Sequence, residues 1–198
     1  MLSAENDKIH KRDGNVFDRF LRLSDSVFAI TLTLLVLSVI PDGAEDLNAE
    51  LVSLVPELVD FWVTVFIVAI YWREHLVVFD SLRGVDGVML ALNFVYLGLV
   101  ALLPFPNRLL SLFDDPLAYV VFAALLLILV IVEILMLAYA RWRGLLTERG
   151  ASAFRSDVIR GTVAVSFFGA SVPLAYVLGP FTPAVWLLPV LVNIAVSR

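Results

Sequence analysis

The sequence predicts an all-α membrane protein with six transmembrane helices, and three observations support this fold class. The chain of 198 residues is 61% hydrophobic and 17% charged, with a mean hydropathy of +0.93, whereas globular chains average roughly 45–50% apolar and about 25% charged residues. Several apolar runs approach the ~20 residues that cross about 30 Å of hydrocarbon. The basic residues, finally, are sorted to one side of these runs.

The first element is a polar segment, residues 1–16, which we expect to be cytoplasmic. It contains neither the apolar region nor the small-residue cleavage site of a signal peptide, so the next apolar run is expected to remain as a helix. Residues 17–198 are then predicted to form one six-helix transmembrane domain. The predicted spans are 17–40, 51–72, 86–104, 117–140, 158–178 and 181–197.

The last two predicted spans are less regular than the others. Pro173, Pro183 and Pro189 interrupt them, and only a short turn, GPFTP, joins them. Proline removes a helical hydrogen bond and kinks or ends a helix. A single re-entrant unit is therefore an alternative to two complete spans at this end of the chain.

The basic residues predict the orientation. With six spans, all but one of the 14 lysines and arginines fall on the side of the N-terminus, and Arg108 alone falls opposite. Lysine and arginine gather on the cytoplasmic side of membrane proteins. The sequence thus predicts a multi-pass plasma-membrane protein with both termini cytoplasmic. The residues on the N-terminal side are Lys8, Lys11, Arg12, Arg19, Arg22, Arg73, Arg83, Arg141, Arg143, Arg149, Arg155, Arg160 and Arg198.

Several function classes are excluded by missing motifs. The sequence lacks a phosphate-binding G-x-x-x-x-G-K-[ST] loop, a TVGYG potassium filter and the regularly spaced arginines of a voltage sensor. It has no cysteine and 2 histidines, which argues against an intramembrane enzyme, a resident metal or another cofactor. Nothing indicates a nucleic-acid partner. A passive pore, an ion-coupled carrier and a scaffolding membrane protein remain.

Asp25 is a carboxylate inside the first predicted span, RFLRLSDSVFAITLTLLVL. A charge at this depth must be paired, or face protein or water, which makes it a candidate site. Alternatively, Ser24 and Asp25 cap a helix that begins at residue 26. That helix would reach Ile40 after only about 21 Å, which is short for a span. A start near Phe17 gives a full-length span and places Asp25 in its interior.

The inner end of the second span, AIYWREHLVVFD, is expected to lie at the same depth as Asp25. Arg19 and Asp25 point about 120° apart on a helix and cannot easily pair, whereas Arg22 is close enough to pair locally. Trp72 and His75 can hold an Asp–Arg network in place. They are equally typical of an interfacial belt, and the residues alone leave both interpretations open.

Other polar residues within the spans have less specific interpretations. Glu133 lies near the middle of the fourth span, where it either meets an Arg or Asn of another helix or stays protonated. Asn93 and Asn193 are predicted to form hydrogen bonds between helices.

Three motifs in order resemble the endosomal/lysosomal potassium channel family, the transmembrane protein 175 family. Residues 19–25, RFLRLSD, are similar to its R-x-x-x-F-S-D signature, YWREH to its aromatic–Trp–His segment, and LVALLPFPNRLL to the end of its third helix. Two positions depart from the family pattern: Leu23 replaces the signature Phe, and Leu76 stands where relatives often have a second His.

The resemblance implies a passive, weakly potassium-selective cation channel, formed by a homotetramer in the lipid bilayer. The first helix of each subunit would line a central pore, with a hydrophobic constriction in place of a carbonyl filter. Carried onto this sequence, the constriction is formed by Ile30, Thr33 or Leu34, and Leu37. The structural network is implied at the inner end of this helix, at Arg19, Ser24, Asp25, Trp72 and His75. Permeating potassium would be the only metal ion.

Helical geometry permits the constriction that the resemblance implies. From Ile30, Leu34 is rotated by about 40°, Leu37 by about −20° and Thr33 by about −60°, so all share one stripe. The same stripe is typical of an ordinary packing seam. Two alternatives to a channel stay open: a proton-permeable or proton-coupled carrier, with Asp25, Glu133 or His75 as relay, and a scaffold without transport.

Overall fold

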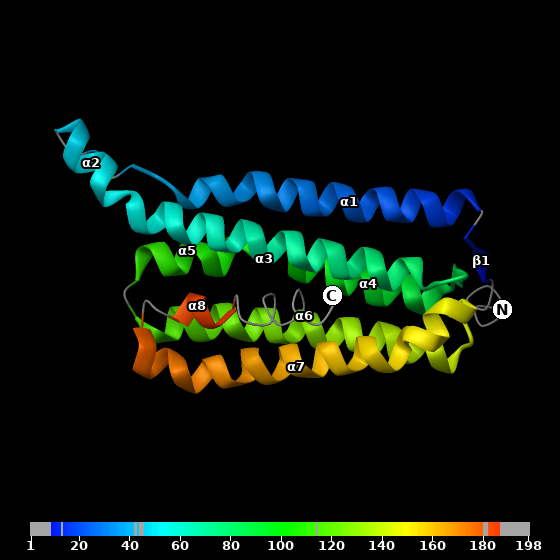
Figure 1. Ribbon diagram of the computed structural model, residues 1–198. Coiled ribbons are helices and arrows are strands. Elements are labelled where there is room, and N and C mark those ends of the chain that lie inside the picture. Colours follow the sequence, from blue (N-terminus) through cyan, green and yellow to red (C-terminus); the bar gives the residue numbers. More distant parts are fainter. Residues whose placement is uncertain are drawn as a thin grey trace.

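The computed structural model describes residues 9–12, 14–41, 43, 46–113, 115–179 and 182–186. Long helices run side by side and form an elongated bundle, with a short strand ribbon at the end where the chain enters (Figure 1). The elements are β1 (His10–Lys11), α1 (Asn15–Leu35), the 3-10 turn η1 (Val36–Ser38), α2 (Leu47–Ser53), α3 (Val55–Asp80), β2 (Gly84–Val85), α4 (Gly87–Ala101), α5 (Pro104–Leu112), α6 (Pro116–Trp142), α7 (Glu148–Leu178) and α8 (Thr182–Trp186).

Within the described residues, 5 helical segments are long and apolar enough to cross a membrane. They correspond to the first five predicted spans, which supports a multi-pass membrane protein. Of the sixth predicted span, α8 covers Thr182–Trp186, and its other residues lie outside the described part of the chain. The segments are Asn15–Ser38, Leu47–Asp80, Gly87–Leu112, Pro116–Trp142 and Glu148–Leu178.

Two helices extend well beyond their predicted spans. α3 continues to Asp80 because the segment after Trp72 holds no glycine or proline and buries Val78 and Phe79 in the core. α7 begins at Glu148, where the Thr147 hydroxyl accepts a hydrogen bond from the Gly150 amide at 3.0 Å and caps the helix. Hydropathy marks the membrane-embedded part of a helix, whereas capping and packing decide where the helix ends.

The proline-rich segment PFPN, at which the third predicted span ends, is instead the first turn of α5. Proline fits the first turn of a helix because the amide that it lacks has no partner there. The chain bends at Leu102 and Leu103, between α4 and α5, and then continues in helical form to Leu112. The third span is therefore two helices in sequence.

α1 begins at Asn15, after Gly14 as the N-cap, so Asp25 lies in the helix interior. The alternative in which Ser24 and Asp25 cap a later helix is wrong. One face of α1 buries Phe17, Phe28 and Leu35 against α3 and α4. This face fixes the rotation of α1 and leaves its opposite side directed away from the protomer.

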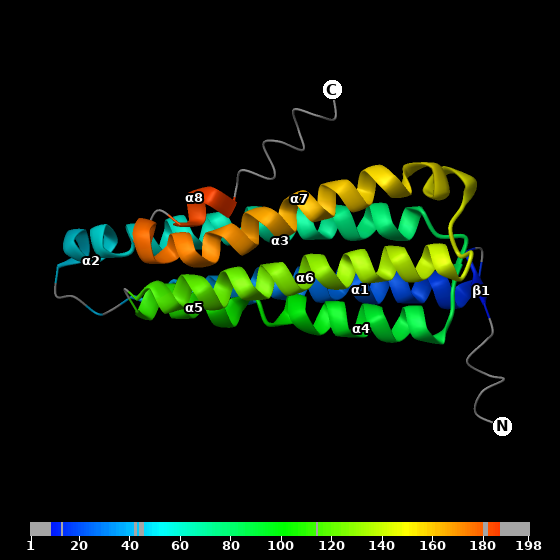
Figure 2. The same ribbon diagram turned by 90° about the horizontal axis from the view of Figure 1, so that it is seen from below.

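α6 provides much of the core, with Phe122, Leu126 and Leu129 completely buried. It packs along α7 on one side and against α4 and α5 on another, and Figure 2 shows α6 between α7 and α4. Because lipid is as apolar as these side chains, close packing and interhelical hydrogen bonds hold such a bundle together.

At the end of the bundle where β1 lies, β1 and the connecting loops form a layer that joins the helices (Figure 1). β1 pairs with β2, and the Thr147 amide donates to the Ser81 carbonyl at 2.8 Å. The side chain of Asp86 caps α4 by accepting from the Met89 amide at 3.0 Å, and it also accepts from the Tyr139 hydroxyl at 2.8 Å. These contacts fix the register of α3, α4, α6 and α7.

Candidate ion pathway along the first helix

The outward side of α1 and of η1, which continues it, carries all four predicted constriction residues. Ile30 is 58% exposed, Leu34 41% and Leu37 61%, and Thr33 is exposed beside them. The other side of the same helix is packed into the core. Within the described protomer, this apolar stripe is therefore left uncovered, and it is available to lipid or to other copies of the chain.

Thr33 is the polar member of this stripe. Its hydroxyl donates a hydrogen bond to the Ile30 carbonyl at 2.7 Å. The proton therefore points toward the backbone, and the oxygen lone pairs stay available to a cation or a water molecule. Leu37 lies in η1, where the backbone is tighter than in an α-helix, yet its side chain still points outward.

Asp25 contacts α3 through Trp72, whose Nε1 donates to the Asp25 carboxylate at 2.9 Å. Within the described part of the chain, neither Arg19 nor Arg22 forms an ion pair with Asp25, and Arg73 pairs instead with its neighbour Glu74 at 3.4 Å. The hydrogen-bond partner of Asp25 is thus the indole of Trp72, whereas the sequence suggested an arginine as its partner.

Ser24 and His75 meet through Asn93 of α4. The Asn93 amide nitrogen donates to the Ser24 hydroxyl at 3.2 Å, and its oxygen lies 2.8 Å from His75 Nε2. Because that oxygen is an acceptor, the His75 proton in this contact resides on Nε2. All three side chains are buried. We call Ser24, Asp25, Trp72, His75 and Asn93 the Ser24 network.

A second set of polar contacts holds the other end of α1, and sequence reasoning missed it. Asn107 donates to the Ser38 hydroxyl at 2.7 Å and accepts from the Thr64 hydroxyl at 2.6 Å. Arg108 Nη1 donates to the Ser38 carbonyl at 2.9 Å. We call Ser38, Thr64, Asn107 and Arg108 the Ser38 network. The sequence contained one sign of this network, namely a small polar residue in each of three apolar segments: Ser38, Thr64 and Asn107.

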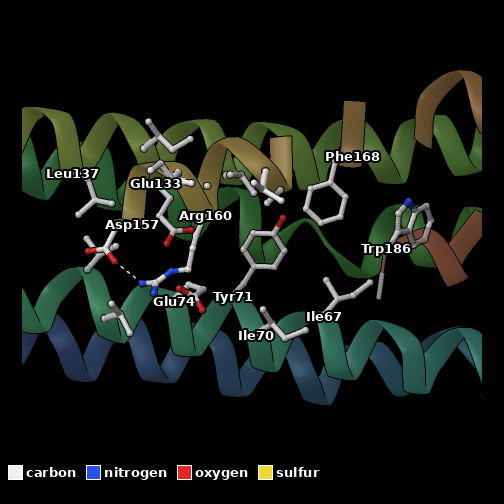
Figure 3. A pocket seen from close by; sticks show the side chains of 18 residues that line it. Ile67, Ile70, Tyr71, Glu74, Glu133, Leu137, Asp157, Arg160, Phe168 and Trp186 are labelled. Carbon is white, nitrogen blue, oxygen red and sulfur yellow. Dashed lines mark hydrogen bonds and ion pairs between the residues drawn. The ribbon is translucent and has the colours of Figure 1, made fainter. Parts of the chain in front are cut away.

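A cavity of about 210 Å³ lies between α3, α6 and α7, apart from the uncovered stripe. Its lining is mostly apolar but includes Glu74, Glu133, Asp157 and Arg160, and none of its lining residues belongs to α1. Figure 3 shows Glu133 and Arg160 side by side in this cavity, and Arg160 is ion-paired with Asp157. The positive charge that faces Glu133 is therefore Arg160, one of the options considered from sequence.

The described residues contain no group of three or more His, Cys, Asp or Glu side chains placed to hold a metal ion. The uncovered stripe offers the Thr33 hydroxyl and apolar side chains to a permeating ion.

Comparisons with known proteins identify the family. A family profile described as endosomal/lysosomal potassium channel TMEM175 matches residues 19–104, which include the first two motifs quoted above and the first half of the third. A Streptomyces collinus protein named as a potassium channel is 32% identical over an alignment of 183 residues, which covers 86% of this chain and 87% of that protein. The chain belongs to the TMEM175 family.

One further relative and two solved structures are also similar to this chain. A Marivirga tractuosa protein named as a potassium channel is 33% identical over 101 residues, 50% of this chain and 39% of that protein. The fold matches a solved lysosomal potassium-selective channel TMEM175 homolog from Chamaesiphon minutus, with a TM-score of 0.68, 24% identity, and coverage of 86% and 96% of the two chains. A solved variant of the potassium channel MtTMEM175, bound to a nanobody fusion, gives a TM-score of 0.64 at 21% identity, with 91% of each chain covered.

Proposed function

We propose that this chain is the subunit of a homotetrameric, weakly potassium-selective channel whose central pore is lined by α1. The observation that carries the proposal is the uncovered stripe of Ile30, Thr33, Leu34 and Leu37, opposite a fully packed face of the same helix. The names of the relatives support potassium as the permeating ion. The proposal includes a sixth span, residence in the plasma membrane and cytoplasmic termini, which the sorting of basic residues supports.

In such a tetramer, four copies of the stripe would form successive rings along the pore axis. Ile30 and Leu37 are about 10 Å apart along the helix, a suitable length for a constriction. Rings of Ile and Leu offer no ligand to a dehydrating cation, so they gate by dewetting or pass ions that keep part of their hydration shell. The apolar rings alone discriminate weakly between potassium and sodium.

Thr33 supplies the polar ring between the apolar ones. Its hydroxyl proton is held by the Ile30 carbonyl at 2.7 Å, so four oxygen atoms would face the ion and replace part of its water shell. Potassium gives up water more readily than sodium, because its charge is spread over a larger radius. The result is a modest preference for potassium.

The two networks act on the pore without lining it. The Ser24 network and the Ser38 network hold α1 at positions about 21 Å apart along the helix, and the constriction lies between them. Asn93 and Asn107, which join α1 to its neighbours, are both completely buried. They fix the rotation and depth of α1, and with them the direction of the constriction side chains.

A planar-bilayer recording of the purified protein under opposing potassium and sodium gradients tests this function. We expect a current that persists without a pH gradient and reverses nearer the potassium than the sodium equilibrium potential. A flux that requires a proton gradient would support the carrier instead, and absence of any ion flux would support the scaffold. The sequence contains no cysteine. Single cysteines placed at Leu37 and, as a control at an exposed position of α6, at Ile128 therefore show which face a water-soluble thiol reagent reaches.

A further inference from the structure

Arg108 is separated from the other basic residues of the protein. Among the residues that the structure describes, every other lysine and arginine lies in the half of the bundle nearest β1, whereas Arg108 lies on α5 at the opposite end (Figure 1). A cation at this end is unexpected in a protein proposed to conduct cations.

The Arg108 guanidinium lies at the C-terminal end of the proposed pore helix. Its Nη1 donates to the carbonyl of Ser38, the last residue of η1, at 2.9 Å. The unpaired carbonyl groups at a helix C-terminus carry about half a negative elementary charge. Arg108 adds a full positive charge beside it, so the end of each pore helix becomes net positive by about half a charge.

Neighbouring contacts hold this arginine in place. Asn107 precedes Arg108 in the chain and is completely buried, with hydrogen bonds to the side chains of both Ser38 and Thr64. α5 is therefore fixed against η1, and Arg108 is itself half-buried. The charge belongs to a defined position at the end of the helix, unlike that of a freely moving surface side chain.

Arg108 also lies close to the constriction. The residue that it contacts, Ser38, directly follows Leu37 in the chain, and the side chain of Leu37 is 61% exposed. The next carboxylate along the chain that the structure describes is Asp46, which caps α2 through the Ala49 amide at 3.1 Å. In Figure 1, α2 extends beyond the end of α1 and away from it. Arg108 thus lies nearer the constriction along α1 than this acidic residue does.

We propose that Arg108 is a conductance-determining residue: four copies form a positive ring at one mouth of the pore and lower the concentration of cations there. This inference rests on the proposed tetrameric pore lined by α1. Each guanidinium lies roughly 10 Å, one helix width, from the axis. Removal of four charges at this distance raises the local potassium concentration about sevenfold at about 0.01 M salt. Screening at 1 M salt reduces the factor to about one.

The test is a single-channel recording of full-length Arg108→Gln at about 0.01 M and 1 M KCl. We expect the conductance for potassium entering from the Arg108 side to be about sevenfold above wild type at low salt and equal to wild type at high salt. Arg108→Lys keeps the charge and should behave as wild type. Arg155→Gln, an exposed arginine of α7 near the other end, controls for the loss of one arginine from the chain.

The possible results separate this inference from the proposed function. A wild-type protein without any cation current would overturn both. A second possible result is that the wild type conducts, while the conductance of Arg108→Gln relative to wild type is the same at both salt concentrations. This result would overturn only the charge ring, because salt does not screen the effect of a structural change.

The wild-type protein provides a second measurement if Arg108→Gln does not assemble. A positive mouth predicts a conductance that rises more steeply than in proportion to KCl concentration below about 0.1 M. A conductance that levels off toward a constant value at low salt would indicate a negative mouth and would contradict the inference.

Discussion

Replacement of Asn93 by leucine tests the Ser24 network most directly. Asn93 is completely buried on α4 and joins Ser24 of α1 to His75 of α3 through contacts of 3.2 and 2.8 Å. Leucine has a similar volume, so the exchange removes both hydrogen bonds without creating a large cavity. His75 would then keep its Nε2 proton in an apolar environment, stacked between Phe79 at 4.5 Å and Tyr96 at 5.4 Å.

The expected loss of stability follows from these contacts. An interhelical hydrogen bond in a membrane contributes about 0.6 kcal/mol on average, and a buried polar group left without a partner costs about 1–3 kcal/mol. Two lost bonds and one unpaired imidazole N–H therefore destabilise each subunit by about 2–4 kcal/mol. The Ser24 hydroxyl adds little, because it still donates to the Phe20 carbonyl at 3.1 Å.

Thermal or denaturant unfolding in detergent measures this loss, with Val95→Leu, at an exposed position of the same helix, as the matched control. A double variant distinguishes an unpaired group from poor packing. Asn93→Leu combined with His75→Phe keeps an aromatic ring between Phe79 and Tyr96 and removes the unpaired N–H, so it should be more stable than Asn93→Leu alone. A double variant as unstable as the sum of its single variants would refute this reasoning.

Three further predictions concern the constriction, Asp25 and the loop layer. Leu37→Ala or Ile30→Asn should raise conductance and reduce potassium selectivity in bilayer recordings; unchanged currents from both would mean that α1 does not line the pore. Asp25→Ala should lower the tetramer yield in size-exclusion chromatography, since the Trp72 indole loses its acceptor at 2.9 Å; a stable, fully conducting tetramer would contradict this role. Gly150→Val should destabilise the fold by about 1–3 kcal/mol in thermal unfolding, because a Cβ atom at residue 150 would lie 2.5 Å from the Ser81 carbonyl oxygen. The control is Gly169→Ala in the same helix, where an added Cβ atom meets nothing within 4 Å and should leave the stability unchanged.

The sequence predicted the first five spans because lipid forces every backbone polar group of a crossing segment into a helix. The same rule placed Asp25 inside α1, since a later start would leave too short a span. It did not predict the start of α7. Arg149 and Asp157 lower the hydropathy of this segment, and yet the Thr147 cap begins the helix before them.

The residues that join the helices were harder to predict than the helices. Hydrogen bonding by Asn93 was expected, but its partners depend on how α1, α3 and α4 are rotated about their axes, and no single-helix pattern encodes that rotation. Ser38, Thr64 and Asn107 were missed for the same reason, because each alone is an ordinary small polar residue in an apolar segment. Their meeting at 2.6 and 2.7 Å became visible only in three dimensions.

The two networks also constrain how the proposed pore would open. Tilting α1 away from the axis would break its bonds to Trp72, Asn93, Asn107 and Arg108, at a cost of about 2–4 kcal/mol per subunit if each contributes about 0.6–1 kcal/mol. A change of side-chain rotamer at Ile30 or Leu37 breaks none of these bonds, because it moves the side chain between staggered conformations and leaves the backbone in place. We therefore expect opening to proceed through the side chains and hydration of the constriction, with α1 held in place at both ends.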